Sequence, residues 1–139
     1  MNKTLNILAA EEHVDDGDPK VLQLANDADP LAIEVCLSDI ERIDLHFPKF
    51  TDGRAYSQAR LLRERMGYTG ELRAAGQVYI DQIPFMLRCG FDSFSSAQKG
   101  FAEALAKART LFSVVYQPTG DGRTTVNQLR LQHHRSVAA

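Results

Sequence analysis

The chain has 139 residues, of which 44% are hydrophobic and 24% are charged, and its formal net charge is −2. These values are typical of one globular domain, and a net charge near zero gives no reason to expect nucleic acid as a partner. No apolar run approaches the ~20 residues of a membrane span, and the first residues are a poor match to a signal peptide. We therefore expect a cytoplasmic protein without a nucleic-acid or membrane partner.

Charge and turn residues divide the chain into three parts. Residues 1–19 carry five acidic side chains against one lysine, and we expect a flexible, loosely ordered acidic lead. Residues 20–117 form the expected single α/β domain. Turn residues at 118–122 then open a basic C-terminal tail, residues 118–139, in which residues 124–131 either form a short strand or stay mobile.

The first expected strand covers residues 21–25 and leads into a turn. Asp29 and Pro30 form a good N-cap and N1 pair, because proline has no backbone donor to lose at that position. Leu31, Val35 and Ile40 then recur at helical spacing, which favours a helix from Pro30 onward. The β-branched residues in this segment leave a strand as the alternative.

Three further strands and three further helices alternate after residue 42. The second strand covers residues 43–47 and ends or kinks at Pro48, and a helix follows over residues 53–66 with Gly67 just beyond its end. Residues 72–75 form a short third strand. The third helix covers residues 78–88 with Gly90 as its C-cap, and Pro84 predicts a kink or a broken start. A brief strand at 91–94 precedes the longest helix, residues 97–115.

This alternation predicts a parallel sheet with right-handed crossovers. About four successive βα units fit either half of a βα-barrel or a small open sheet, and we expect sequential strand order. Both arrangements leave exposed strand edges, which proteins tend to cover. We therefore expect a possible homodimer, with the tail strand as another cover for an edge.

The loops that follow parallel strands share one rim, where ligands usually bind. Arg54 lies in the DGR turn at the start of a helix, and Arg73 lies near the end of the third strand, so the two guanidinium groups are expected to hold an oxyanion there. The structural alternative is that Asp52 caps the helix and pairs with Arg54. The candidate ligand residues are Asp52, Gly53, Arg54, Ser57, Arg73, Gly76, Asp81 and Gln82.

Three arginines of the second helix, Arg60, Arg63 and Arg65, form a charged face that is either solvated or a docking surface for a partner. Cys36 and Cys89 have no CxxC spacing, so we expect two buried, reduced thiols. The chain has neither GxGxxG nor GxxxxGK[ST], and its histidines suggest no catalytic triad. We therefore predict no cofactor, no metal site and no identified catalytic residue.

The run FPKFTDGRAYSQARLLRERMGYTGELRAAGQVYIDQIPFMLRCGFDSF, residues 47–94, resembles a bacterial family catalogued as domain of unknown function 934. Members are commonly labelled as oxidoreductases of sulfite reduction, chiefly because they are encoded beside sulfite or nitrite reductase haemoproteins. The resemblance implies a cytoplasmic role in assimilatory sulfur metabolism, with the sulfite or nitrite reductase system or its electron donor as partner. The chain departs from the family pattern at Ala55, Gln77, Ile80 and Pro84.

Two functions follow as expectations. The first is an accessory protein of assimilatory sulfite reduction that docks on the reductase system, binds a small oxyanion at the DGR loop, or does both. The alternative is a small oxidoreductase or other enzyme that acts on a sulfur oxyanion or a phosphorylated ligand. The family pattern has an acid where this chain has Gln77, so this rim position is a poor candidate for acid–base catalysis.

Overall fold

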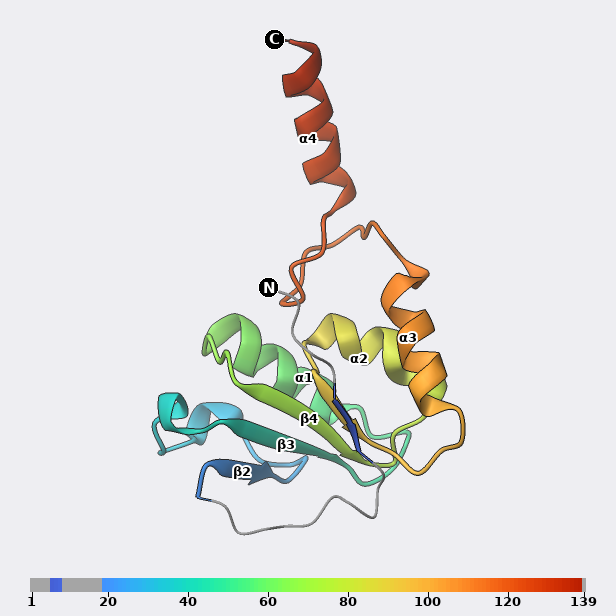
Figure 1. Cartoon of the computed structure of the whole chain (residues 1–139). Coiled ribbons are helices and arrows are strands. Elements are labelled where there is room, and N and C mark those ends of the chain that lie inside the picture. The colour runs from blue at the N-terminus through green and yellow to red at the C-terminus, as the bar shows by residue number, and fades with distance from the viewer. Residues whose placement is uncertain (1–5, 9–18, 139) are drawn as a thin grey trace.

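The computed structural model describes residues 6–8 and 19–138 of the chain. Five strands form one parallel sheet in the order β1-β5-β4-β3-β2 (Figure 1). The strands are β1 (Asn6–Leu8), β2 (Val21–Leu24), β3 (Arg42–Phe47), β4 (Glu71–Gly76) and β5 (Ser93–Ser95). The predicted α/β class with about four βα units is confirmed, and β2 to β5 follow chain order as expected.

The strand β1 was not predicted, and it pairs with β5 at the far edge of the sheet. Among the described residues the sheet is open, because β1 and β2 are its two edges. The expected looseness of the acidic lead, residues 1–19, falls on residues that, apart from 6–8 and 19, lie outside the described part. The boundaries of the three proposed parts of the chain stay predictions.

Helices α1 (Arg54–Arg60), α2 (Ile83–Cys89) and α3 (Phe101–Leu111) lie on the same face of the sheet (Figure 1). The helix expected over residues 53–66 is present, but its second half is a π-helix, η4 (Leu61–Arg65). Helix α2 begins after a 3-10 turn, η5 (Ile80–Gln82), and Pro84 lies in its first turn. Helix α2 therefore has the broken start that was expected from Pro84. Helix α3 is shorter than predicted.

The core fills the space between the sheet and these helices. Ile43, Leu45 and Phe47 alternate along β3 and are fully buried, because successive strand residues point to opposite faces. Ala59 of α1 and Met86 of α2 pack against that face and are equally buried. Within the described residues, no helix is both long enough and apolar enough to cross a bilayer.

Two glycines end elements where another residue would not fit. Gly90 follows α2 with a φ of 100°, in the left-handed conformation expected of its C-cap. Gly76 ends β4 with a φ of 91°, and a Cβ there would lie 2.4 Å from the carbonyl oxygen of Phe47. This close approach keeps the β3 and β4 ends together, which places their following loops side by side at the rim.

The helix predicted from Pro30 was wrong, and so was the alternative strand. The segment forms two separate 3-10 turns, η2 (Pro30–Ala32) and η3 (Leu37–Asp39), with Asp29 capping the first through Leu31 N at 2.9 Å. Ile33 is extended, with a ψ of 119°, and ends η2. Since Leu31 and Val35 are both half exposed, no buried face stabilises a longer helix here.

Residues 124–131 were expected to form a short strand or to stay mobile, and the strand was wrong. The chain forms helix α4 (Val126–Val137), which extends away from the sheet and the other helices (Figure 1). Thr125 caps it: the Thr125 hydroxyl accepts from Gln128 N at 3.2 Å, and the Gln128 side chain accepts from Thr125 N at 2.8 Å. This capping box starts the helix at Val126.

The face of the sheet opposite α1, α2 and α3 is polar. Gln23, Asp44, Arg73 and Ser93 pair in register and form one row across four strands. Asp44, Arg73 and Ser93 are nevertheless buried. Buried polar groups need hydrogen-bond partners, so the side chains of this row are expected to bond to one another or to their neighbours.

Candidate functional site

The DGR loop joins β3 to α1 at the rim and holds a three-residue polar cluster. Arg54 donates to Asp52 through both edges of its guanidinium, Nε to Oδ1 at 3.1 Å and an Nη to Oδ2 at 2.8 Å. The backbone N–H of Arg54 also donates to Asp52 Oδ1, and Asn26 Nδ2 donates to Oδ2 at 2.6 Å. The side-chain hydrogen bond from Arg54 is the largest of the effects that lower the pKa of Asp52 to about 2.

This geometry supports the structural alternative for Asp52 and Arg54. The carboxylate is ionised and already occupies the fork of Arg54, so an oxyanion would have to compete with it. The Arg54 side chain is 60% exposed and so remains open to a partner on its outer side. Gly53 and Ser57 are exposed beside it.

Glutamine side chains join the loop after β4 to the loop after β3. Gln77 Oε1 accepts from Phe50 N at 3.1 Å, and Gln82 Nε2 donates to Phe50 O at 3.3 Å. Gln82 also caps η5 by accepting from Tyr79 N. The candidates Gly76 and Gln82 therefore shape the rim, while Asp81 is exposed in the first turn of η5.

Aromatic side chains that the sequence interpretation missed lie on the same rim. Phe50, Tyr79 and Phe85 are 53%, 39% and 56% exposed. Phe50 packs edge-on against Tyr79 with ring centroids 6.0 Å apart, and Phe85 lies 4.7 Å from Tyr56. Burial is the main cause that raises the pKa of Tyr56 to about 12. We call Phe50, Tyr56, Tyr79 and Phe85 the aromatic rim. The sequence could have indicated it, since all four residues come from the two segments that follow the second and third predicted strands.

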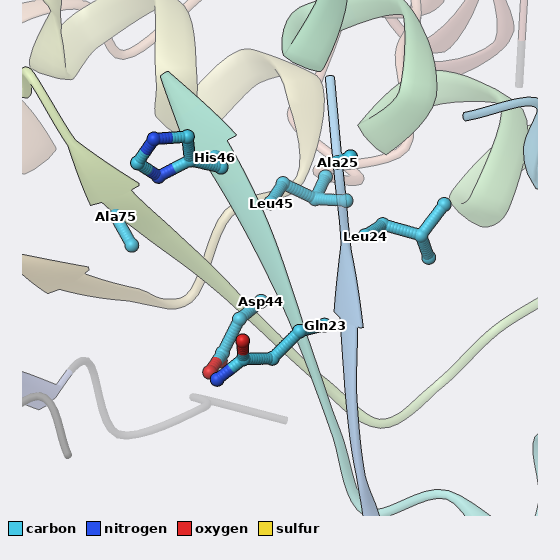
Figure 2. Close-up of a pocket in the computed structure, with 7 residues that line it drawn as sticks. All are labelled: Gln23, Leu24, Ala25, Asp44, Leu45, His46 and Ala75. Carbon is cyan, nitrogen blue, oxygen red and sulfur yellow. The ribbon is translucent and has the colours of Figure 1, made fainter. Parts of the chain in front are cut away.

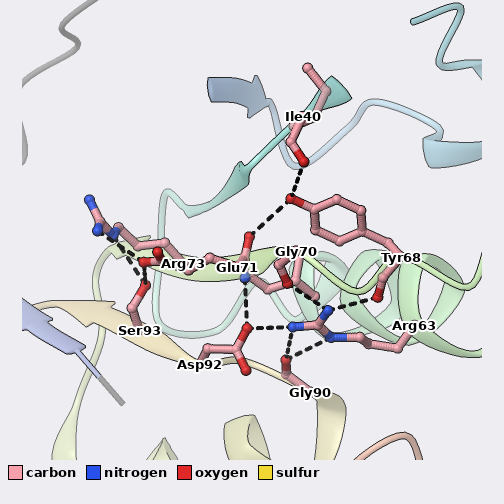
Figure 3. A network of polar contacts seen from close by, with 10 residues as sticks. Ile40, Arg63, Tyr68, Gly70, Glu71, Arg73, Gly90, Asp92 and Ser93 are labelled. Carbon is pink, nitrogen blue, oxygen red and sulfur yellow. Dashed lines mark hydrogen bonds and ion pairs between the residues drawn. The ribbon is translucent and has the colours of Figure 1, made fainter. Parts of the chain in front are cut away.

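Arg73 does not reach the rim, so its predicted convergence with Arg54 was wrong. It lies in mid-strand on the polar face, where it donates to Glu71 Oε1 at 3.0 Å and to Ser93 Oγ at 3.2 Å (Figure 3). Ser93 in turn donates to Glu71 at 2.5 Å. Because Glu71 begins β4, the guanidinium is held toward the amino end of the sheet, away from the DGR loop.

Arg63 is enclosed, so the prediction that it serves as a docking residue was wrong. Its guanidinium donates to the carbonyl oxygens of Tyr68, Gly70 and Gly90 and to Asp92 Oδ2, at 2.5–3.0 Å (Figure 3). Only 8% of its side chain is exposed. Arg60 pairs with Glu64 one helical turn away, and Arg65 is exposed, so these two stay candidates for docking.

A hollow of about 350 Å³ opens on the polar face and is a second candidate site (Figure 2). Gln23, Asp44 and His46 supply its polar lining, over a floor of Leu24, Ala25, Leu45 and Ala75. Arg42 Nε donates to Asp44 Oδ1 at 2.9 Å, whereas Gln23 and His46 are exposed. The alternation of polar Arg42, Asp44 and His46 along β3 was the available sequence signal for this face.

Comparisons with known proteins agree with the resemblance of the central run. A family model described as "Bacterial protein of unknown function (DUF934)" matches residues 21–127. The match includes every strand from β2 onward and helices α1, α2 and α3. Neither a curated protein nor a solved structure matches the chain.

Proposed function

The chain belongs to this bacterial family of unknown function, and we propose that it is a cytoplasmic accessory protein of assimilatory sulfite reduction. It docks through the aromatic rim on the sulfite reductase system or its electron donor. The assignment to sulfite reduction rests on the resemblance of residues 47–94, and the docking role rests on the shape and chemistry of the rim.

The exposed aromatic side chains are the observation that carries the docking role. Phe50 and Phe85 each leave more than half of their surface in solvent. Exposed aromatic groups that gather at one place are typical of protein interfaces, where such rings contribute much of the binding energy. The side-chain amides of Gln77 and Gln82 bond the backbone of Phe50, and Phe85 lies in helix α2, so little ordering is required on binding.

Charges beside the aromatic rim add specificity. Arg54 is 60% exposed on one side, and Asp81 is exposed at the start of η5. A rim that combines rings with exposed charges of both signs suits a protein surface, because charges at the edge of an interface select the partner and speed its approach.

The positions of Arg54 and Arg73 favour docking over catalysis. The two arginines expected to hold an oxyanion lie apart, since Arg73 is bonded to Glu71 and Ser93. Arg54 is paired with Asp52 through both sides of its fork. The enzyme alternative therefore lacks the converging charges that its chemistry needs.

A deletion strain tests the pathway. We expect a strain without this protein to grow with cysteine as sole sulfur source, and to grow poorly with sulfate or sulfite. Equal growth on all three sources would contradict the assignment. Wild-type protein should restore growth on sulfite.

The same strain tests the surface. A Phe50→Ser, Phe85→Ser variant should fail to restore growth on sulfite and should lose binding to the immobilised reductase system at low salt. The matched control is Phe112→Ser, which changes an equally exposed ring, 57%, away from the rim. Loss of function in both variants, or in neither, would rule out the aromatic rim as the docking site.

A further inference from the structure

Helix α4 has no partner within the described part of its own chain. Its residues from Asn127 to Val137 are exposed, including Leu129 at 41%, Leu131 at 55% and Val137 at 71% (Figure 1). An isolated helix of twelve residues is only marginally stable in water. A surface that covers its apolar residues would therefore stabilise it.

The loop before α4 is anchored to the body, which fixes where the helix points. Arg88 pairs with Asp121 at 2.5 Å and donates to Gln117 O, and Arg123 pairs with the other oxygen of Asp121 at 3.4 Å. Val126 N also donates to Val115 O at 2.9 Å. These bonds hold the start of α4 and direct the helix away from its own sheet.

The surface of α4 is apolar and basic. Val126, Leu129, His133 and Val137 recur at spacings of three, four and four residues, so they share one stripe of the helix. Residues 122–139 contain no Asp or Glu, and Arg130 and Arg135 are exposed on α4. A partner for this helix must therefore offer apolar contacts together with negative charge.

The body has a surface of that kind at the β2 edge. Residues 26–39, which we call the acidic edge, include η2 and η3 and contain no Lys, Arg or His. Leu31 is 55% and Val35 50% exposed there. Four carboxylates are exposed around them, and none has an ion pair within residues 6–8 and 19–138: Asp27, Asp29, Glu34 and Asp39.

We propose that α4 of one copy of this chain packs on the acidic edge of a second copy, and that the contact is reciprocal in a two-fold dimer. Opposite charges and exposed leucines on both surfaces support this pairing. A closed dimer makes the contact twice, which doubles the area that holds it. Pairing of α4 with α4 is disfavoured, because it would bring the arginines of two basic helices together.

Charge reversal tests the proposal on the full-length chain by sedimentation equilibrium. In the helix variant, Arg130→Glu and Arg135→Glu make α4 acidic. In the edge variant, Glu34→Lys and Asp39→Lys make the edge basic. Each variant alone should dissociate, with a dimer dissociation constant at least about tenfold above that of the wild type.

An equimolar mixture of the two variants should form a heterodimer, because both contacts then join opposite charges. The edge variant alone separates this interface from α4–α4 pairing, in which it would dimerise like the wild type. The matched control is Lys107→Glu with Arg109→Glu on the exposed side of α3, which should leave the dimer unchanged. Circular dichroism checks that every variant is folded.

Three results would overturn the proposal: a wild-type chain that is monomeric at low salt, a dimer that survives both reversals, or a mixture that does not associate. A monomer that binds anionic vesicles or nucleic acid through α4 would assign the basic helix to another partner instead.

Discussion

Asp52 and Arg54 are joined by two parallel hydrogen bonds, from Nε to Oδ1 at 3.1 Å and from an Nη to Oδ2 at 2.8 Å. The pair holds the guanidinium of Arg54 against its own loop, although 60% of the side chain stays exposed. It explains why the helix begins at Arg54 although its N-cap, Gly53, has no side chain to offer.

The pair predicts the titration of Asp52. The pKa of the folded carboxyl is about 2, below its ordinary 3.8, so the pair stabilises the fold fully above pH 3.8 and loses that effect as the pH falls toward 2. The carboxyl carbon of Asp52 should titrate near pH 2 by NMR. In Arg54→Ala the midpoint should move up toward 3.8, and an unchanged midpoint would contradict the role of Arg54.

Replacement of Arg63 should unfold the protein at much lower denaturant. Arg63→Ala removes the Arg63 guanidinium from Asp92 and from three backbone carbonyls, and the loss of one partner from a buried pair costs about 3–5 kcal/mol in free energy of unfolding. Urea titration measures this. The neighbouring Arg65→Ala is the control and should change the free energy by about 0.5 kcal/mol or less, because Arg65 is exposed.

Gly76→Ala should destabilise the fold more than Gly67→Ala. Both glycines have positive φ, 91° and 65°, so both substitutions carry the left-handed penalty of roughly 1–2 kcal/mol. A Cβ at Gly76 would also lie 2.4 Å from Phe47 O, whereas one at Gly67 meets nothing within 4 Å. Thermal unfolding should therefore show the larger loss at Gly76, and equal losses would contradict the close approach of β3 and β4.

The two cysteines should differ in reactivity. Burial is the largest of the effects that raise the pKa of the Cys89 thiol to about 11. Cys36 is exposed, so the expectation that both thiols are buried was wrong for Cys36. Because the thiolate is the reactive form, iodoacetamide near pH 8 should label Cys36 quickly and Cys89 only on unfolding. Mass spectrometry of the digested protein measures both sites. Rapid labelling of Cys89 in the folded protein would show that α2 opens.

Local signals predicted the part of the fold that they determine. The alternation along β3, the strand end before the DGR turn and the C-cap at Gly90 each depend on neighbouring residues, and each is present in the structure. The capping box of Thr125 and Gln128 was equally local, and the expectation of a short strand or a mobile segment over residues 124–131 did not take it into account.

The remaining errors concern contacts between distant parts of the chain. Arg63 follows the pattern of a solvated helix face, yet Gly90 and Asp92, which enclose it, lie 27 and 29 residues further along the chain. Arg73 was placed by its nearness to a strand end, whereas its partner Ser93 comes from β5. A sequence pattern shows which face of an element a residue occupies, but not which acceptors gather around it.

The π-helix η4 sets the direction in which the chain leaves Arg63. A π turn holds about one residue more than an α turn, so the five residues of η4 turn the chain about as far as four residues of an α-helix. If the same five residues formed regular α-helix, the residues that follow would be rotated by about 100° around the axis. Tyr68 and Gly70, whose carbonyl oxygens accept from Arg63, would then move away from its guanidinium. The wider helical turn therefore lets a buried charge be bonded by the loop into which its own helix leads.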